Sequence, residues 1–269
     1  MGKPDRTIAS KVPQVTLAFW IIKLLATTVG ETGGDAVSMT LDLGYAVASL
    51  IYVAFFGVAL AIQVASRRYR PLSYWAVVVA TTTVGTTLSD YLDRTVGLGY
   101  VKSSFVLLLG VFAVLLLWRR VAGRIVFEKI TERRDEVFYW LTILVSNTLG
   151  TALGDFVATT AGVGFGHGTL VFGTLLALVA AGHRFVPAIS ANVYFWAAYV
   201  LSRPFGATLG DLLTKPRDEG GLALGRIAAS LVILATMLLG ILLVSWRDRN
   251  NARKKSQTAP TPGREAPPF

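Results

Sequence analysis

The segment FWIIKLLATTVGETGGDAVSMTLDLG, residues 19–44, carries the pattern from which the fold can be predicted. Its landmarks are Trp20, Gly30, Asp35 and Gly44, with the spacing W-x9-G-x4-D-x8-G. The same residue types return at the same spacing three more times, at Trp75, Gly85, Asp90 and Gly99; at Trp140, Gly150, Asp155 and Gly164; and at Trp196, Gly206, Asp211 and Gly220. Chance does not produce four identical spacings, so the chain is built from four copies of one repeat.

Each motif lies in an apolar stretch, and a second apolar stretch follows it. We predict transmembrane helices at about 15–35, 44–65, 72–91, 103–118, 137–156, 168–182, 190–212 and 226–246. Eight spans of about 20 residues would use most of this chain of 269 residues, of which 53% are hydrophobic. The expected fold is therefore an all-α polytopic membrane protein of about eight transmembrane helices. The helices form four parallel two-helix repeats within one domain, residues 1–246, with repeats at about 15–66, 71–120, 136–184 and 190–246.

Because all four motifs lie on odd-numbered spans, the repeats have the same orientation and are related by an axis along the membrane normal. Pseudo-fourfold symmetry around this axis and an arrangement of two pairs are both compatible with the pattern.

The net charge of +10 is explained by membrane orientation rather than by nucleic-acid binding, because the basic residues lie between the apolar spans. Lys and Arg gather in alternate segments, at 3–11, 67–70, 119–134, 184 and 247–264. Both termini are therefore expected in the cytoplasm of a bacterium, with the protein in its inner membrane. The basic and proline-rich tail, residues 247–269, is predicted to be disordered.

A polar stripe leads to the aspartate of every repeat. Steps of four residues stay on one helical face. Counted back from each aspartate, this face reads Lys23, Thr27, Glu31, Asp35; Val78, Thr82, Thr86, Asp90; Ile143, Asn147, Thr151, Asp155; and Tyr199, Arg203, Ala207, Asp211. Ionisable residues inside a membrane usually face the protein interior or a wet cavity, so we expect the four stripes to converge.

Converging stripes would form an oxygen-rich site for a divalent cation or a proton relay. The candidate ion-binding residues are Glu31, Asp35, Asp90, Asp155, Asp211, Thr27 and Asn147. The hypothetical metal ligands among them are Glu31, Asp35, Asp155 and Asp211. Lys23 and Arg203 are the expected internal counter-charges, and Pro204 is expected to kink or break its helix.

Structural roles compete with these functional ones. Asp90, Asp155 and Asp211 could instead cap a turn or pair with a loop residue such as Arg94. Glu31 could form a purely structural ion pair with Lys23 or with Arg203. Each motif glycine has a small residue four positions later, a pattern that favours close helix packing, with room for an ion as the alternative.

Signals for enzyme chemistry are absent from the sequence. There is no cysteine, and the two histidines lie in predicted loops. No zinc-protease motif, nucleophile elbow or phosphate-binding loop occurs, so an enzyme is not expected, and neither is a cofactor apart from a bound divalent cation.

The segments 11–32 and 195–211, with the fourfold motif, resemble a widespread and uncharacterised family of bacterial multi-pass inner-membrane proteins. The stretch Glu31-Thr32-Gly33-Gly34-Asp35 also looks like the acidic E-x-G-D signature of cation/proton exchangers for Ca²⁺ and Mn²⁺, although its spacing differs by one residue and those repeats have three helices.

The leading hypothesis is a transporter of a small inorganic cation, a divalent metal, with export of Mn²⁺ as the specific expectation. Besides this cation, the only expected partner is the lipid bilayer. The alternative is a non-transporting membrane subunit or scaffold whose polar stripes only hold helices together. A third possibility is an anion site centred on Lys23 and Arg203.

Overall fold

The computed structural model describes residues 13–258, except 67, 124, 126–129 and 131. The described residues form long α-helices and no strand, which confirms the predicted all-α class. The long helices are α1 (Leu17–Asp35), α2 (Gly44–Ala65), α3 (Pro71–Asp90), α4 (Gly99–Ala122), α5 (Arg133–Asp155), α6 (Phe165–Phe185), α7 (Ala191–Thr214) and α8 (Arg226–Thr258). Short turns follow the odd helices, namely the π-helical turns η1 (Ala36–Thr40), η2 (Tyr91–Thr95) and η3 (Phe156–Thr160), and the 3₁₀ turn η4 (Arg217–Glu219).

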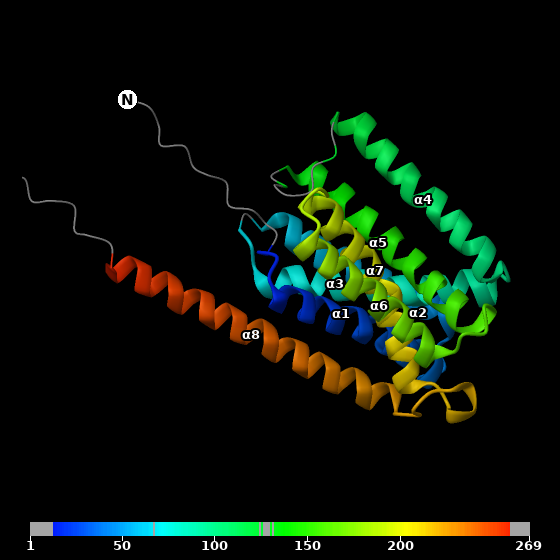
Figure 1. Cartoon of the computed structure of the whole chain (residues 1–269). Helices are drawn as coiled ribbons and strands as arrows, with labels where there is room; N and C mark the ends of the chain where they lie inside the picture. Colours follow the sequence, from blue (N-terminus) through cyan, green and yellow to red (C-terminus); the bar gives the residue numbers. More distant parts are fainter. Residues whose placement is uncertain (1–12, 67, 124, 126–129, 131, 259–269) are drawn as a thin grey trace, which may run out of the picture.

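The motif-bearing helices form an inner ring. α1 packs against α3, α3 against α5, α5 against α7, and α7 returns to α1. The even helices lie outside this ring, and each packs on the motif helix of the next repeat: α2 on α3, α4 on α5, α6 on α7, and α8 on α1 (Figure 1). The ring arrangement matches the pseudo-fourfold option. The principal packing partner of each outer helix lies in the next repeat, so the repeats interlock rather than stand as separate hairpins.

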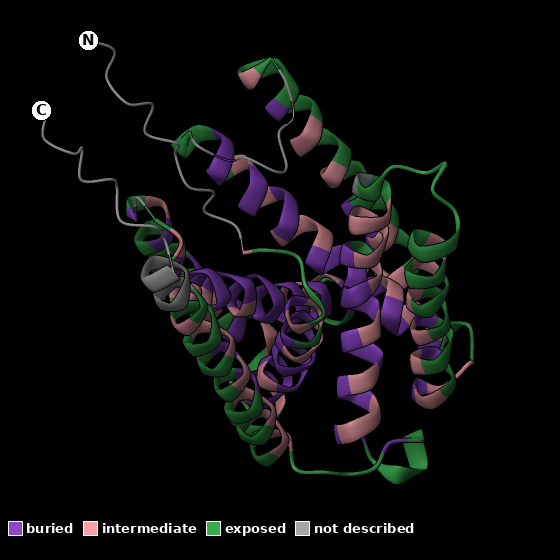
Figure 2. Ribbon diagram, turned by 60° about the vertical axis from the view of Figure 1, so that its left-hand side comes forward, coloured by how far each residue is buried: buried purple, intermediate pink, exposed green. Residues whose placement is uncertain are grey.

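Hydropathy and burial also distinguish the outer helices from the inner ones. Among the described residues, five helical segments are long and apolar enough to cross a membrane, namely α2, α4, α5 with η3, α6 and α8. In the outer helices only 11–28% of the apolar window is buried by the protein, against 61% in α5. Their exposed apolar faces surround the buried inner helices (Figure 2). This is the architecture of a multi-pass membrane protein, in which α1, α3 and α7 tolerate more polar sequences because other helices shield them.

The motif glycines allow the inner helices to touch. A Cβ atom at Gly30 would collide with the side chain of Thr82, one at Gly85 with the backbone at Asn147, one at Gly150 with the side chain of Arg203, and one at Gly206 with that of Thr27. In every case the colliding residue lies eight positions before the aspartate of the next repeat. The glycines therefore serve the helix packing that the small-residue pattern predicted.

The last glycine of each motif has a different role. Gly44, Gly99, Gly164 and Gly220 have φ values of +70°, +70°, +78° and +85°. Side chains with a Cβ rarely adopt this left-handed conformation, so glycine fits the turn that follows each inner helix.

An aromatic layer lies in the inner ring at the end opposite the aspartates. The residue before each motif tryptophan is aromatic, and for Phe19, Tyr74 and Phe195 the ring meets the tryptophan of the next repeat. The ring centroids are 5.6 Å apart for Phe19 and Trp75, 5.4 Å for Tyr74 and Trp140, and 5.6 Å for Phe195 and Trp20. The tryptophans therefore pack neighbouring inner helices against each other.

Two predictions about the C-terminal part need correction. α8 continues to Thr258, so the predicted disordered tail is helical in residues 247–258, where Arg, Asn, Ala, Lys and Gln are compatible with a helix. Residues 259–269 lie outside the described part. α7 runs through Pro204 without a break in its assignment, and the proline ring instead packs beside Gly150.

We expect Gly30→Ala to destabilise the protein by about 1–3 kcal/mol, because the added methyl group meets Thr82 in a packed interface. Gly57→Ala is the matched control, since a Cβ at this exposed position in α2 has nothing within 4 Å. Denaturant unfolding in detergent micelles measures both. Equal effects of the two substitutions would contradict the packing role.

Candidate cation site

The polar stripes line the interior of the inner ring, as predicted. The four motif aspartates are buried, with exposed fractions of 1% for Asp35, 3% for Asp90, 4% for Asp155 and 2% for Asp211. Glu31 and Arg203 are also buried, at 2% and 1%. Charged groups in such an environment need partners, and those partners define the chemistry of the site.

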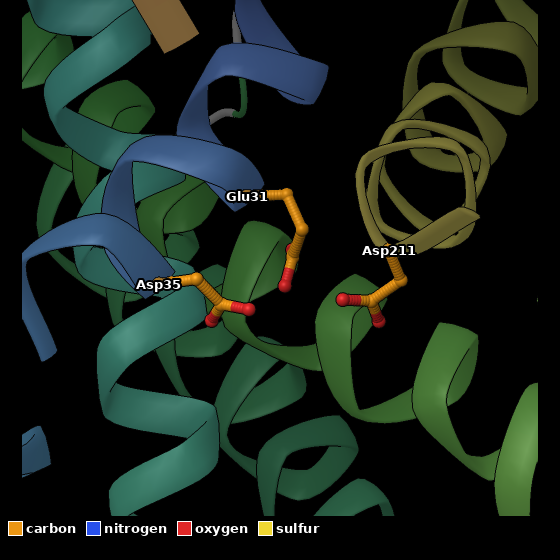
Figure 3. A group of neighbouring side chains, drawn as sticks. All are labelled: Glu31, Asp35 and Asp211. Carbon is orange, nitrogen blue, oxygen red and sulfur yellow. The ribbon is translucent and has the colours of Figure 1, made fainter. Parts of the chain in front are cut away.

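Three carboxylates come together where the first and fourth repeats meet. Glu31 and Asp35 project from α1 and Asp211 from the end of α7, toward a common space (Figure 3). One oxygen of each lies within 4.8 Å of the others. We call these three residues the carboxylate cluster. Oxygen ligands of one divalent cation are separated by at most about 5 Å, so these groups could share an ion after small adjustments.

A lysine ammonium lies between two of these carboxylates. Lys215 Nζ is 3.0 Å from Asp35 Oδ2 and 3.1 Å from Asp211 Oδ1. Arg226 Nε, at the start of α8, is 3.7 Å from the same Asp35 oxygen. The other oxygen of Asp35, Oδ1, is buried and accepts no hydrogen bond from the described residues. The cluster is thus occupied by cations that belong to the protein itself.

Backbone hydrogen bonds hold Lys215 in this place. The loop after α7 folds back on the helix end, with Leu222 N donating to Leu212 O at 2.7 Å and Leu224 N to Leu213 O at 2.9 Å. Ala223 N donates to the carbonyl of Lys215 itself, also at 2.9 Å. The inner helix of the fourth repeat is therefore followed by a loop that is hydrogen-bonded back to the helix end. The inner helices of the first three repeats continue into a π-helical turn instead.

Arg203 links three repeats to the fourth. Its Nη2 donates to Glu31 Oε2 at 2.9 Å and to Thr86 Oγ1 at 2.6 Å, and it also contacts Thr151 Oγ1. Thr86 Oγ1 is itself 3.1 Å from Glu31 Oε2. Of the two ion pairs considered from the sequence, the structure contains Arg203–Glu31. The stripes converge on this pair.

The second and third aspartates differ from the other two. Asp90 forms an ion pair with Arg94 one turn later, at 2.9 Å, which is the loop pairing considered as a structural alternative. The carboxylate of Asp155 forms no ion pair with the described residues. Neither side chain belongs to the carboxylate cluster, although Asp155 was predicted as a ligand beside its three members.

The two uncharged candidates are engaged elsewhere. The hydroxyl of Thr27 donates to backbone carbonyls of its own helix, at 2.8 Å from Leu24 O, and the side chain fills the space at Gly206. The amide of Asn147 donates to Thr81 Oγ1 at 3.0 Å. Both residues contribute to the contacts between inner helices.

Lys23 does not act as a counter-charge in this structure. It is completely buried, and its Nζ has no hydrogen-bond partner among the described residues. Its Nζ lies over the ring of Tyr199, 4.1 Å from the ring centroid.

Sequence reasoning missed Lys215 and Arg226 as residues of the site. Both reduce the net negative charge around the carboxylate cluster. A signal for Lys215 was present, because Asp211 and Lys215 have the same four-residue spacing as Asp90 and Arg94.

The comparisons with known proteins agree with the fourfold repeat. A family described as Repeat of Unknown Function (DUF347) matches residues 18–69, 73–124, 138–186 and 194–250. No curated protein and no solved structure matches the chain. The four matched segments cover most of the sequence and coincide with the repeats of the ring, so the chain belongs to the DUF347 repeat family.

Proposed function

We propose that this protein transports a small cation, a divalent metal, with Mn²⁺ export as the specific case. The observation that carries the proposal is the carboxylate cluster, buried inside a ring of transmembrane helices and occupied by the ammonium group of Lys215. Buried carboxylates among membrane helices are costly, and they commonly mark an ion or proton pathway.

Lys215 supplies a means of exchange. A transporter must release its substrate, so a site that holds a cation tightly needs a competitor. An ammonium tethered to the protein can occupy the carboxylates when the substrate is gone and withdraw when it arrives. The net charge of the cluster then changes little between the loaded and the empty state, which avoids leaving uncompensated charges buried.

The composition of the cluster favours a hard cation. Only carboxylate oxygens are offered by its three members, and Mg²⁺, Ca²⁺ and Mn²⁺ prefer such ligands over nitrogen or sulfur. Within this proposal Glu31, Asp35 and Asp211 are ligands or proton carriers, and Arg203 keeps Glu31 charged and oriented until the substrate binds. No reaction chemistry is part of it, and the protein acts as a carrier rather than an enzyme.

The distribution of basic residues supports an orientation with both termini in the cytoplasm of a bacterial cell and the protein in the inner membrane. The aspartate end of the inner ring then faces away from the cytoplasm, and the aromatic layer lies toward it. A cation leaving the cell would pass the aromatic layer first and reach the carboxylates afterwards.

A second candidate is a non-transporting subunit or scaffold. The observation that favours it is the pairing within the site, because Glu31, Asp35 and Asp211 all have basic partners and could serve only to fix helices. The two candidates differ in whether ions cross the membrane and whether Glu31 is needed for that passage.

If the protein is the proposed transporter, we expect Mn²⁺ to enter lipid vesicles that contain the purified protein. The entry is measured as quenching of a Mn²⁺-sensitive dye enclosed in the vesicles. Glu31→Gln should reduce this flux to the level of protein-free vesicles, because the neutral amide has lost the charge that attracts the cation. The variant should still fold, since glutamine can accept the hydrogen bond from Arg203. Glu132→Gln is the matched control at an exposed position, and its flux should equal that of the wild type.

An absence of flux in the wild type for Mn²⁺, Mg²⁺ and Ca²⁺, together with a strongly destabilised Glu31→Gln variant, would favour the scaffold and end the transport proposal.

Lys215→Met should tighten equilibrium binding of Mn²⁺ by about tenfold or more, because the competing ammonium is removed from between two carboxylates. Calorimetric titration of the detergent-solubilised protein measures this affinity. Lys102→Met, at an exposed position in α4, controls for the loss of one positive charge and should leave the affinity unchanged. Weaker binding in Lys215→Met would show that the lysine assists the cation instead of competing with it.

A further inference from the structure

The inner ring contains a group of buried hydrogen-bond donors that the cation site does not use. Lys23 Nζ has no acceptor among the described residues, and neither do Nε and Nη1 of Arg203. Lys23 is 0% exposed and Arg203 is 1% exposed. Unpaired donors of this kind, all three of them on side chains that can carry a charge, are expensive to bury and call for a ligand or a partner.

These donors belong to α1 and α7, two inner helices that pack against each other. Nζ of Lys23 lies against the ring of Tyr199, with a centroid distance of 4.1 Å. Tyr199 and Arg203 are separated by one turn on the same face of α7, and the buried hydroxyl of Tyr199 also lacks a partner among the described residues. Lys23, Tyr199 and Arg203 therefore belong to two successive layers of the stripes from the first and fourth repeats.

No carboxylate is placed to satisfy Lys23. Glu31 lies eight residues further along α1, about 12 Å away along the helix axis. Helical side chains lean toward the N-terminus, so that of Lys23 is directed away from Glu31. Glu31 is also paired with Arg203. The positions equivalent to Lys23 in the second and third repeats are Val78 and Ile143, which are buried and carry no charge.

The charge balance sets the valence of a ligand. Because the Arg203–Glu31 pair is neutral as a whole, a protonated Lys23 adds one uncompensated positive charge to this part of the ring. A single negative charge would balance it and favour the protonated form, and the hydroxyl of Tyr199 would supply a further hydrogen bond.

We propose that Lys23 and Tyr199 form a binding site for a small monovalent anion, between the aromatic layer and the carboxylate cluster. The anion is either a free inorganic ion or the carboxylate group of an organic solute, two sources with the same chemistry at the lysine. The site adds a second class of ligand to the proposed transport function and does not depend on it, because anion binding can be measured without a divalent metal.

The test is the thermal unfolding of the full-length protein in detergent, free of divalent metals, at constant ionic strength. Chloride, nitrate and acetate are each titrated against a bulky organic sulfonate, an anion that is larger than all three, carries no carboxylate group and serves as the reference. A ligand of the folded state raises the melting temperature in a saturable manner, whereas general salt effects are not saturable and act on all variants alike. We expect a saturable rise for the wild type. A rise with chloride or nitrate indicates an inorganic ion, and a rise with acetate alone indicates a carboxylate.

Lys23→Met should abolish the saturable rise and still fold, because replacing an unpaired buried charge by an apolar side chain of similar length is neutral or stabilising. Lys102→Met is the matched control and should retain the rise. Tyr199→Phe keeps the ring beside Lys23, loses the hydroxyl, and should weaken binding several-fold.

The proposal is overturned if none of the three anions stabilises the wild type, or if Lys23→Met keeps the same saturable rise. Wild-type protein that transports Mn²⁺ but does not respond to anions would remove the anion site and leave the cation proposal intact. Wild-type protein that responds to anions but does not transport Mn²⁺ would remove the cation proposal alone.

Discussion

The contact between each motif glycine and the residue eight positions before the aspartate of the next repeat is the constraint on which the rest of the structure depends. It brings the backbones of neighbouring inner helices together, and it recurs four times because the fourth repeat meets the first at Gly206 and Thr27. This closure turns a linear series of repeats into a ring. In lipid no hydrophobic force draws helices together, so close packing of small residues and interhelical polar contacts must hold them. The outer helices cover the ring and present its apolar surface.

Ring closure also explains why the repeats are not equivalent in their chemistry. The carboxylate cluster forms only where the two ends of the chain meet, since Glu31 and Asp35 belong to the first repeat and Asp211 and Lys215 to the fourth. Repeats two and three keep the aspartate, but Asp90 has a partner in its own helix turn and Asp155 has none among the described residues. The glycine contacts, which are alike in all four repeats, pack the inner helices into a ring. The charged residues, which differ between repeats, place the carboxylate cluster where the first and fourth repeats meet. A tethered ammonium in the cluster supports exchange against a substrate cation.

Much of the fold could be predicted because the repeat shows as identical residue types at identical spacing. The glycine spacing predicts helix packing, and the four-residue steps predict the polar stripes. The partners of the charged residues could not be predicted in the same way. Spacing along one helix cannot say that Arg203 reaches Glu31 in preference to Lys23, because this choice depends on how α7 and α1 lie beside each other. Lys215 was missed since its position depends on a loop that folds back on α7 by backbone hydrogen bonds. The helical extension to Thr258 was missed because a basic, polar sequence without an apolar face resembles a disordered tail.

The meeting of the fourth repeat with the first can be measured directly where the outer helix α8 packs on the inner helix α1, because the chain contains no cysteine. A Cβ at Gly240 in α8 would lie 3.5 Å from Ile22 Cγ1 in α1. We expect the double variant with cysteine at these two positions to form an intramolecular disulfide in native membranes under mild oxidation, seen as a shift in electrophoretic mobility that reductant reverses. Each single-cysteine variant should show no such shift. Failure of the double variant to cross-link, or formation of dimers alone, would contradict the closed ring and with it the meeting of the first and fourth repeats at the carboxylate cluster.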